Sequence, residues 1–196
     1  MKLTGTLLIF AGIVVFGGIF SGEYFFDGYS IKNNTISDLG QRVDPINTSL
    51  KSSILFNGAM ILSGLAMALA AVLLYTKLNN NWITIPFFIH GLATCGVGLV
   101  NTTIKPAHLI IAIITFLTIE FTSIASYNLT NGNMKYLLAG CGVVSIIFLV
   151  GNLLFVKLMG VGIAERFIVY PTTIWLFVIG IFLLTKYDEV SNVLKK

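Results

Sequence analysis

The stretch LTGTLLIFAGIVVFGGIFSGEY, residues 3–24, is apolar over about the length of a membrane-crossing helix and decides the fold class. Five further runs of similar length and composition follow it and fill most of the 196 residues. A hydrocarbon core about 30 Å thick needs about 20 helical residues to cross it. The six runs lie at residues 3–24, 52–76, 83–101, 109–127, 136–156 and 167–185.

The runs contain no Lys or Arg, and their acidic residues are Glu23 near one end and Glu120 deep in the fourth run. They are continuously apolar, whereas the strands of a membrane barrel alternate apolar and polar residues. Helices satisfy every backbone hydrogen bond within lipid. The sequence therefore predicts an all-α, polytopic integral membrane protein: one six-helix transmembrane domain over residues 1–196, with a long structured loop at residues 25–51.

Composition narrows the possible partners. Apolar residues make up 56% of the chain and charged residues 10%, so the net charge of +4 is weak support for nucleic-acid binding. The basic residues stand mostly at helix ends, where long cationic side chains reach the lipid headgroups. Cys95 and Cys141 lie inside apolar runs without metal or redox spacing, and we interpret them as packing residues. The predicted partner is the lipid bilayer, and no nucleic acid is expected.

The Lys and Arg residues do not decide the orientation in the membrane, because six lie on each side of the predicted bundle. Asn33 and Asn47 begin glycosylation-type sequons in the long first loop, and the tail ends in Lys195 and Lys196. We therefore expect a multi-pass protein of the cell membrane with both termini in the cytoplasm.

His90 and Glu120 are the ionisable residues deep inside the runs, where such groups are rare and often functional. With a rise of about 1.5 Å per residue, each lies about 10 Å from a predicted helix end on the same side of the membrane. We predict that they form an intramembrane polar pair. The pair would lock two helices together or serve in a proton relay.

A second group of polar residues gathers where the odd-numbered loops meet the membrane. His108, Asp38 and Glu165 are candidates for acid–base catalysis. Arg166 is the residue expected to bind an anionic lipid headgroup, because its planar guanidinium suits phosphate. Asp38 is expected to approach Arg166 or His108 once the first loop folds back over the bundle. The candidate binding residues are Arg166, Ser37, Asn57 and Asn152.

Known cofactor and metal motifs do not occur in the sequence. Walker, Gly-x-Ser-x-Gly, Cys-x-x-Cys and His-Glu-x-x-His patterns are missing. A carboxylate-rich metal site made by Asp38, Glu165 and His108 is the one arrangement left open. The sequence predicts neither a cofactor nor a metal.

Three stretches resemble a family of prokaryotic membrane proteins catalogued as domain of unknown function 998: NTISDLG at residues 34–40, His108, and GIAERFIVYP at residues 162–171. The similarity spans nearly the full length, including the spacing of six helices. Val100 and Asn101 stand where the family often has an aromatic residue followed by Pro. The resemblance implies the membrane fold and a set of residues at the membrane interface, and it brings no established activity.

Three functions fit these residues. The sequence favours a small membrane component that binds a lipid or a partner, or a subunit of a larger membrane complex. The second is a membrane-embedded enzyme acting on a lipid-linked substrate, with His108 as acid or base, Asp38 orienting it and Arg166 holding the headgroup. The third is a proton-coupled transporter that uses His90 and Glu120. Whether the protein is an enzyme stays open at this point.

Overall fold

The computed structural model describes residues 1–41, 49–100, 102 and 104–185. These residues form seven α-helices and two short 3-10 helices, and no strand occurs among them. The prediction of an all-α membrane protein is confirmed. The elements are α1 Lys2–Phe25, η1 Ser37–Gly40, α2 Ser49–Leu78, α3 Asn81–Leu99, α4 Lys105–Ala125, η2 Ser126–Leu129, α5 Met134–Val150, α6 Asn152–Met159 and α7 Val161–Thr185.

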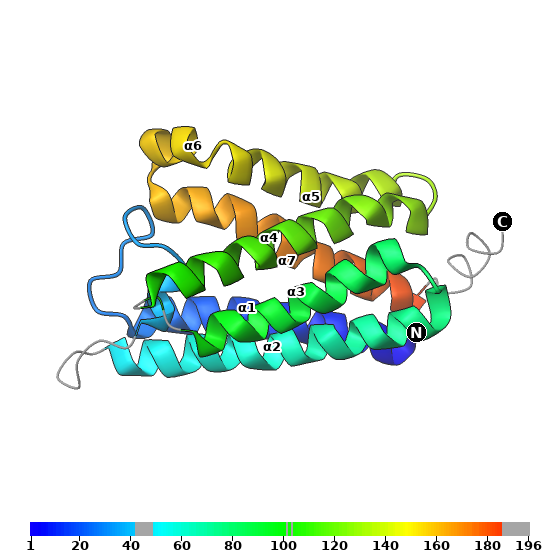
Figure 1. Ribbon diagram of the computed structural model, residues 1–196, viewed down its shortest axis with the longest axis horizontal. Coiled ribbons are helices and arrows are strands. Elements are labelled where there is room, and N and C mark those ends of the chain that lie inside the picture. Colours follow the sequence, from blue (N-terminus) through cyan, green and yellow to red (C-terminus); the bar gives the residue numbers. More distant parts are fainter. Residues whose placement is uncertain (42–48, 101, 103, 186–196) are drawn as a thin grey trace.

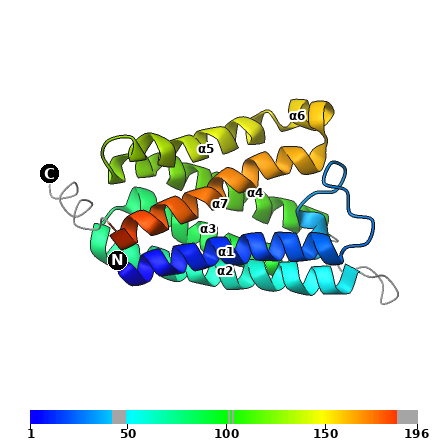
Figure 2. The ribbon, with the colours of Figure 1, turned by 180° about the vertical axis from the view of Figure 1, so that it is seen from behind.

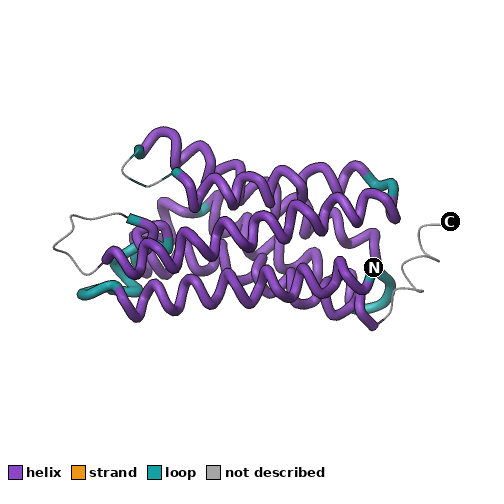
Figure 3. Tube along the Cα trace, turned by 90° about the horizontal axis from the view of Figure 1, so that it is seen from below, coloured by secondary structure: helices purple, strands orange, loops and turns teal. Residues whose placement is uncertain are grey.

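The long helices run along one axis, and the described loops gather at the two ends of the bundle (Figures 1 and 3). Five of them are long and apolar enough to cross a membrane, and the bent pair α5 and α6 makes a sixth if counted as one span. Each helix packs on its neighbours in a closed order, α1 on α2, then α3, α4, α5 and α7, which returns to α1. Figure 2 shows α7 lying between α1 and α5 on the far side. This ring encloses the space in which the candidate site lies.

Glycine allows the tightest helix contacts. A Cβ atom on Gly64 of α2 would lie 2.6 Å from the carbonyl oxygen of Gly91 on α3. A Cβ atom on Gly5 of α1 would lie 2.6 Å from the carbonyl oxygen of Gly180 on α7. In lipid, helices associate through such close backbone contact rather than through the hydrophobic effect.

The fifth apolar run does not form the continuous helix that we predicted over residues 136–156. It breaks at Gly151 into α5 and α6, which are bent by 81°. α6 then ends at Gly160, whose φ of 97° lies in the left-handed region that favours glycine. The last helix consequently begins at Val161 and not at residue 167, so Glu165 and Arg166 belong to its first turns.

The start of α1 and the end of α7 lie together at one end of the bundle (Figure 1). A Cβ atom on Gly5 would lie 2.9 Å from the Leu184 side chain. The first loop, α6 and the start of α7 meet at the opposite end, which we call the polar end. Asn47, Asn101, Lys195 and Lys196, which entered the sequence interpretation, lie outside the described residues.

Candidate functional site

The first loop folds back over the polar end and is bound there by Glu165. One carboxylate oxygen of Glu165 accepts the Ile36 backbone N–H at 2.5 Å, and the other accepts the Ser37 hydroxyl at 3.2 Å. The Gly162 N–H also donates to the Lys32 carbonyl at 3.1 Å. A Cβ atom on Gly162 would lie 2.1 Å from the Asn34 carbonyl oxygen, so glycine is needed for this approach. The start of α7 thus fixes the path of the loop around Lys32 to Ser37.

Asn57 and two serines of α2 hold the other side of the loop. The Asn57 amide donates to the Gly40 carbonyl at 3.1 Å, and Ser53 donates to the same oxygen at 3.1 Å. Ser52 donates to the Leu39 carbonyl at 3.0 Å. Asn57 therefore supports η1. Asn152, the other candidate binding asparagine, begins α6 at the bend.

Asp38 approaches neither Arg166 nor His108, and this prediction is wrong. One oxygen of its carboxylate accepts the Thr35 backbone N–H at 2.8 Å, and the other accepts the Gln41 side-chain amide at 2.6 Å. An Asp carboxylate readily satisfies a nearby backbone N–H in a tight turn. Asp38 stabilises its own loop, and Glu165 makes the contact between the loop and α7 that we had assigned to Asp38.

Arg166 forms the ion pair of the polar end with Glu23 at the end of α1. Its guanidinium also donates to the Tyr29 hydroxyl at 3.0 Å, to the Gly162 carbonyl at 2.8 Å and to the Ile31 carbonyl at 3.3 Å. Arg166 is only 7% exposed. The Glu23 carboxylate therefore gives the guanidinium an anionic partner within the protein, and binding of a lipid phosphate by Arg166 stays a prediction.

Tyr29 belongs to this cluster, and our sequence reasoning missed it. Its hydroxyl accepts from Arg166 and donates to the Thr35 carbonyl at 2.9 Å, and the guanidinium lies 5.6 Å from the ring centroid. Burial raises the pKa of Tyr29 to about 12, so the hydroxyl keeps its proton at neutral pH. Its signal in the sequence was weak, an aromatic residue between Gly28 and Ser30.

His108 is separated from the other candidate catalytic residues. Its Nδ1 lies 2.8 Å from the Val100 carbonyl, so the ring ties the start of α4 to the end of α3. Its Nε2 is buried and has no hydrogen-bond partner in the described part of the chain. No described hydrogen bond or ion pair joins His108 to Asp38 or Glu165, and the described residues contain no cluster of three or more His, Cys, Asp or Glu side chains that could hold a metal.

The predicted hydrogen bond between His90 and Glu120 does not form. His90 Nδ1 lies 2.9 Å from the Thr115 carbonyl, and Glu120 Oε1 lies 2.8 Å from the Ser145 hydroxyl on α5. Thr115 and Glu120 are five residues apart, which is about 140° around a helix, so they face different neighbours. Their depths also differ: His90 lies about 13 Å from the start of α3 and Glu120 about 8 Å from the end of α4.

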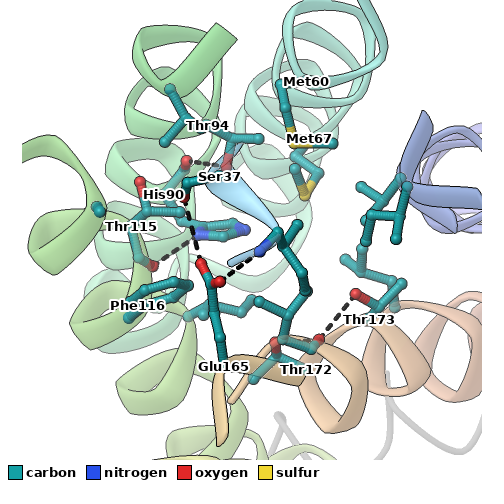
Figure 4. Close-up of a pocket in the computed structure, with 18 of the residues that line it drawn as sticks. Ser37, Met60, Met67, His90, Thr94, Thr115, Phe116, Glu165, Thr172 and Thr173 are labelled. Carbon is teal, nitrogen blue, oxygen red and sulfur yellow. Dashed lines mark hydrogen bonds between the residues drawn. The ribbon is translucent and has the colours of Figure 1, made fainter. Parts of the chain in front are cut away.

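His90 and Glu165 both line a cavity of about 80 Å³ inside the ring of helices (Figure 4). The walls are mostly apolar, and they include Met60 and Met67 of α2. The cavity reaches from the polar end, where Ser37 and Glu165 meet, into the bundle as far as His90. The polar side chains along it are Ser37, His90, Thr94, Thr115, Glu165, Thr172 and Thr173.

The hydrogen bonds of His90 define what it offers to the cavity. Because Nδ1 faces a carbonyl oxygen, it carries the ring hydrogen, and Nε2 is then an acceptor. The second ring nitrogen faces the cavity in Figure 4. The cavity therefore presents one acceptor at His90 and a carboxyl group at Glu165.

A ring of apolar helices around a mostly apolar cavity with two embedded acceptors defines a polytopic helical membrane protein with an internal cavity. The chain belongs to the family of proteins of unknown function DUF998, whose family model matches residues 9–181. No curated protein and no solved structure matches the chain.

Proposed function

We propose that the protein is a membrane-embedded binding protein whose central cavity holds a small, largely apolar molecule bearing an ammonium group. The observation that carries this proposal is the Glu165 carboxyl group, which lines a mostly apolar cavity. Within the described chain the one ion pair joins Arg166 to Glu23, so no described Lys or Arg forms an ion pair with Glu165. A carboxylate at an apolar wall is stabilised by a cation that the ligand brings.

The cavity size limits the apolar part of the ligand. Its volume of about 80 Å³ is roughly half that of the cavity of about 150 Å³ that binds benzene in an engineered protein. A chain of a few carbons would fit beside Met60 and Met67. Methionine side chains adapt to different apolar shapes, which suits a binding wall. His90 offers a second acceptor to a ligand that carries a donor at its other end.

Thermal unfolding of the purified protein with matched four-carbon probes tests the proposal. A bound ligand raises the unfolding midpoint in proportion to its affinity for the folded state. We expect millimolar butylamine to raise the midpoint more than butan-1-ol, and butyrate to have no effect. The substitution Glu165→Gln should abolish the difference between the amine and the alcohol. Ala112→Phe, which fills the cavity from α4, should abolish stabilisation by both.

Ser37→Ala is the matched control, because it removes one hydrogen bond from Glu165 and keeps the carboxyl group. This variant should retain the preference for the amine. Equal stabilisation of the wild type and Ala112→Phe by butylamine would contradict the proposal, and so would no stabilisation at all. If added phosphatidylethanolamine competes with butylamine and phosphatidylcholine does not, the ammonium comes from a lipid headgroup. If neither competes, it comes from a free amine.

We also propose that the protein lies in the cell membrane with both termini in the cytoplasm. The start of α1 lies next to the end of α7, which supports placing both termini on one side of the membrane. The sequon at Asn33 supports a first loop that faces outward. Impermeant thiol labelling of Asn33→Cys in intact cells, in a background lacking Cys95 and Cys141, should succeed. Labelling only after the cells are opened would reverse the orientation.

A further inference from the structure

Glu120 lies at a junction of three helices, outside the central cavity. Its side chain on α4 is 0% exposed, and its Oε1 lies 2.8 Å from the Ser145 hydroxyl oxygen on α5. The same hydroxyl oxygen lies 2.7 Å from the Ile168 carbonyl oxygen on α7. Ser145 is also 0% exposed, so water does not complete its hydrogen bonding.

The number of hydrogen atoms at this junction determines whether Glu120 carries a proton. A serine hydroxyl has one hydrogen, and a backbone carbonyl has none to give. Both oxygen–oxygen distances equal the usual length of an O–H···O bond, about 2.7–2.8 Å, so each contact requires its own hydrogen. Ser145 donates its hydrogen to Ile168, and the hydrogen between Glu120 and Ser145 must then belong to Glu120.

We infer that Glu120 is a proton-binding site inside the membrane, and that its bound proton completes a hydrogen-bond chain from α4 through α5 to α7. The carboxylic acid donates from Oε1 to Ser145. Its second oxygen, Oε2, is buried without a hydrogen-bond partner in the described residues. As the carbonyl oxygen of a neutral acid, Oε2 tolerates this far better than it would as part of a carboxylate.

No described Lys or Arg forms an ion pair with Glu120. α5 presents the Ser145 hydroxyl to it, and that hydroxyl also meets the Ile168 carbonyl of α7. Among the described residues, Arg166 pairs with Glu23 and His90 faces the Thr115 carbonyl. A proton is therefore the cation that this site takes.

Loss of the proton would break the hydrogen-bond chain next to an irregular turn of α7. Pro171 lies inside α7 and has no N–H, so the carbonyl of Phe167, the residue before Ile168, has no helical N–H partner four residues on. An ionised Glu120 would compete with the Ile168 carbonyl for the single Ser145 hydrogen. The Ile168 carbonyl also accepts from Thr172 at 3.3 Å, and Thr172 lines the central cavity. Protonation of Glu120 is thereby connected to one wall of the cavity.

Infrared difference spectroscopy of the protein in lipid bilayers at pH 7 tests the inference. The spectrum of the wild type minus Glu120→Gln should contain the carbonyl stretch of a protonated carboxylic acid and lack the two stretches of a carboxylate. Carboxylate stretches without the acid band would overturn the inference. Glu165→Gln is the control, and it should leave the band of Glu120 in place.

A second variant keeps the test valid if Glu120→Gln does not fold. Ser145→Ala removes the acceptor of the Glu120 hydrogen, so the acid band should move to higher frequency. An unchanged carbonyl region in this variant would overturn the hydrogen-bond chain. Both readouts are independent of ligand binding at Glu165, so the proposed function can fail while this inference stands.

Discussion

The polar end and the Glu120 junction both bury carboxyl groups, and they compensate them in opposite ways. At the polar end, Glu23 pairs with Arg166, whose fixed fork of donors also reaches two backbone carbonyls and Tyr29. Deeper in the bundle, Glu120 contacts only a serine hydroxyl among the described residues. Moving an ion pair out of water costs several kcal/mol per ion before attraction is counted. An ion pair therefore neutralises Glu23 near the end of the bundle, and a bound proton neutralises the deeper Glu120.

The largest effect should come from breaking the ion pair of the polar end. Arg166→Leu leaves the Glu23 carboxylate, whose side chain is 17% exposed, without its cation, and we expect a loss of about 3 kcal/mol in the free energy of unfolding, at the lower end for a buried pair. Unfolding in mixed micelles by a denaturing detergent measures it. Glu120→Gln should lose about 1 kcal/mol or less, because its amide N–H can replace the donated hydrogen.

The double variant Glu23→Gln with Arg166→Leu separates charge from packing. It should be more stable than Arg166→Leu alone, because no buried carboxylate is left without a partner. If Arg166→Leu and Glu120→Gln lose equal stability, the contrast between the two regions is wrong.

Adding a methyl group to a glycine in each region should have the next largest effect. Gly162→Ala brings a Cβ atom to 2.1 Å from the Asn34 carbonyl, and Gly142→Ala brings one to 2.8 Å from the Glu120 carbonyl. We expect losses of about 1–3 kcal/mol, larger for Gly162 because both of its nearest contacts are backbone oxygens.

Gly140→Ala is the matched control, since no atom lies within 4 Å of its added Cβ. Alanine is the better helix former, so this variant should be as stable as the wild type or up to about 1 kcal/mol more stable. A loss in Gly140→Ala as large as that in Gly142→Ala would show that close approach of α4 and α5 is not the cause.

A smaller effect at neutral pH should come from Tyr29→Phe, which removes one hydroxyl from the polar end. Loss of its bonds to Arg166 and to the Thr35 carbonyl should cost about 1 kcal/mol. The variant should differ more in its pH dependence. Because burial raises the pKa of Tyr29 from 10.0 to about 12, its contribution is complete below pH 10 and is lost as the pH rises towards 12.

Unfolding measured from pH 8 to 12 checks this sign. The wild type should lose stability more steeply than Tyr29→Phe between pH 10 and 12. Parallel curves would mean that the Tyr29 hydroxyl is equally easy to ionise in the folded and unfolded states.

The helices could be predicted from the sequence because the length of an apolar run is a local property. The run at residues 3–24 became α1 almost unchanged. The break at Gly151 was not predictable in this way, because Gly151 and Asn152 interrupt an otherwise apolar stretch by only two residues, and only the 81° bend reveals it. The apolar character of a segment indicates that it enters the membrane. It does not indicate whether the helix there is straight or bent.

The sequence predicted where the candidate site residues lie, and it did not predict which residues they contact. Ser37, Glu165 and Arg166 do meet at the polar end, since topology alone brings their segments together. Their partners depend on the rotation of each helix about its axis. Successive residues of a helix lie about 100° apart around its axis, so an error of one residue in that rotation gives a side chain a different neighbour. For this reason Glu165 took the role expected of Asp38, and Glu120 faces α5 instead of His90.

The bend between α5 and α6 turns α6 across the axis of the bundle. When α5 crosses the membrane, a helix at 81° to it runs nearly parallel to the bilayer plane. Leu153 and Leu158 on α6 are 83% and 68% exposed, and Lys157 lies between them. Apolar side chains of such a helix enter the boundary between headgroups and acyl chains, while lysine stays at the headgroups. We expect α6 to lie at the membrane surface, so that a thinner bilayer or looser headgroup packing would shift the depth of Glu165 and Arg166, which follow it in the chain.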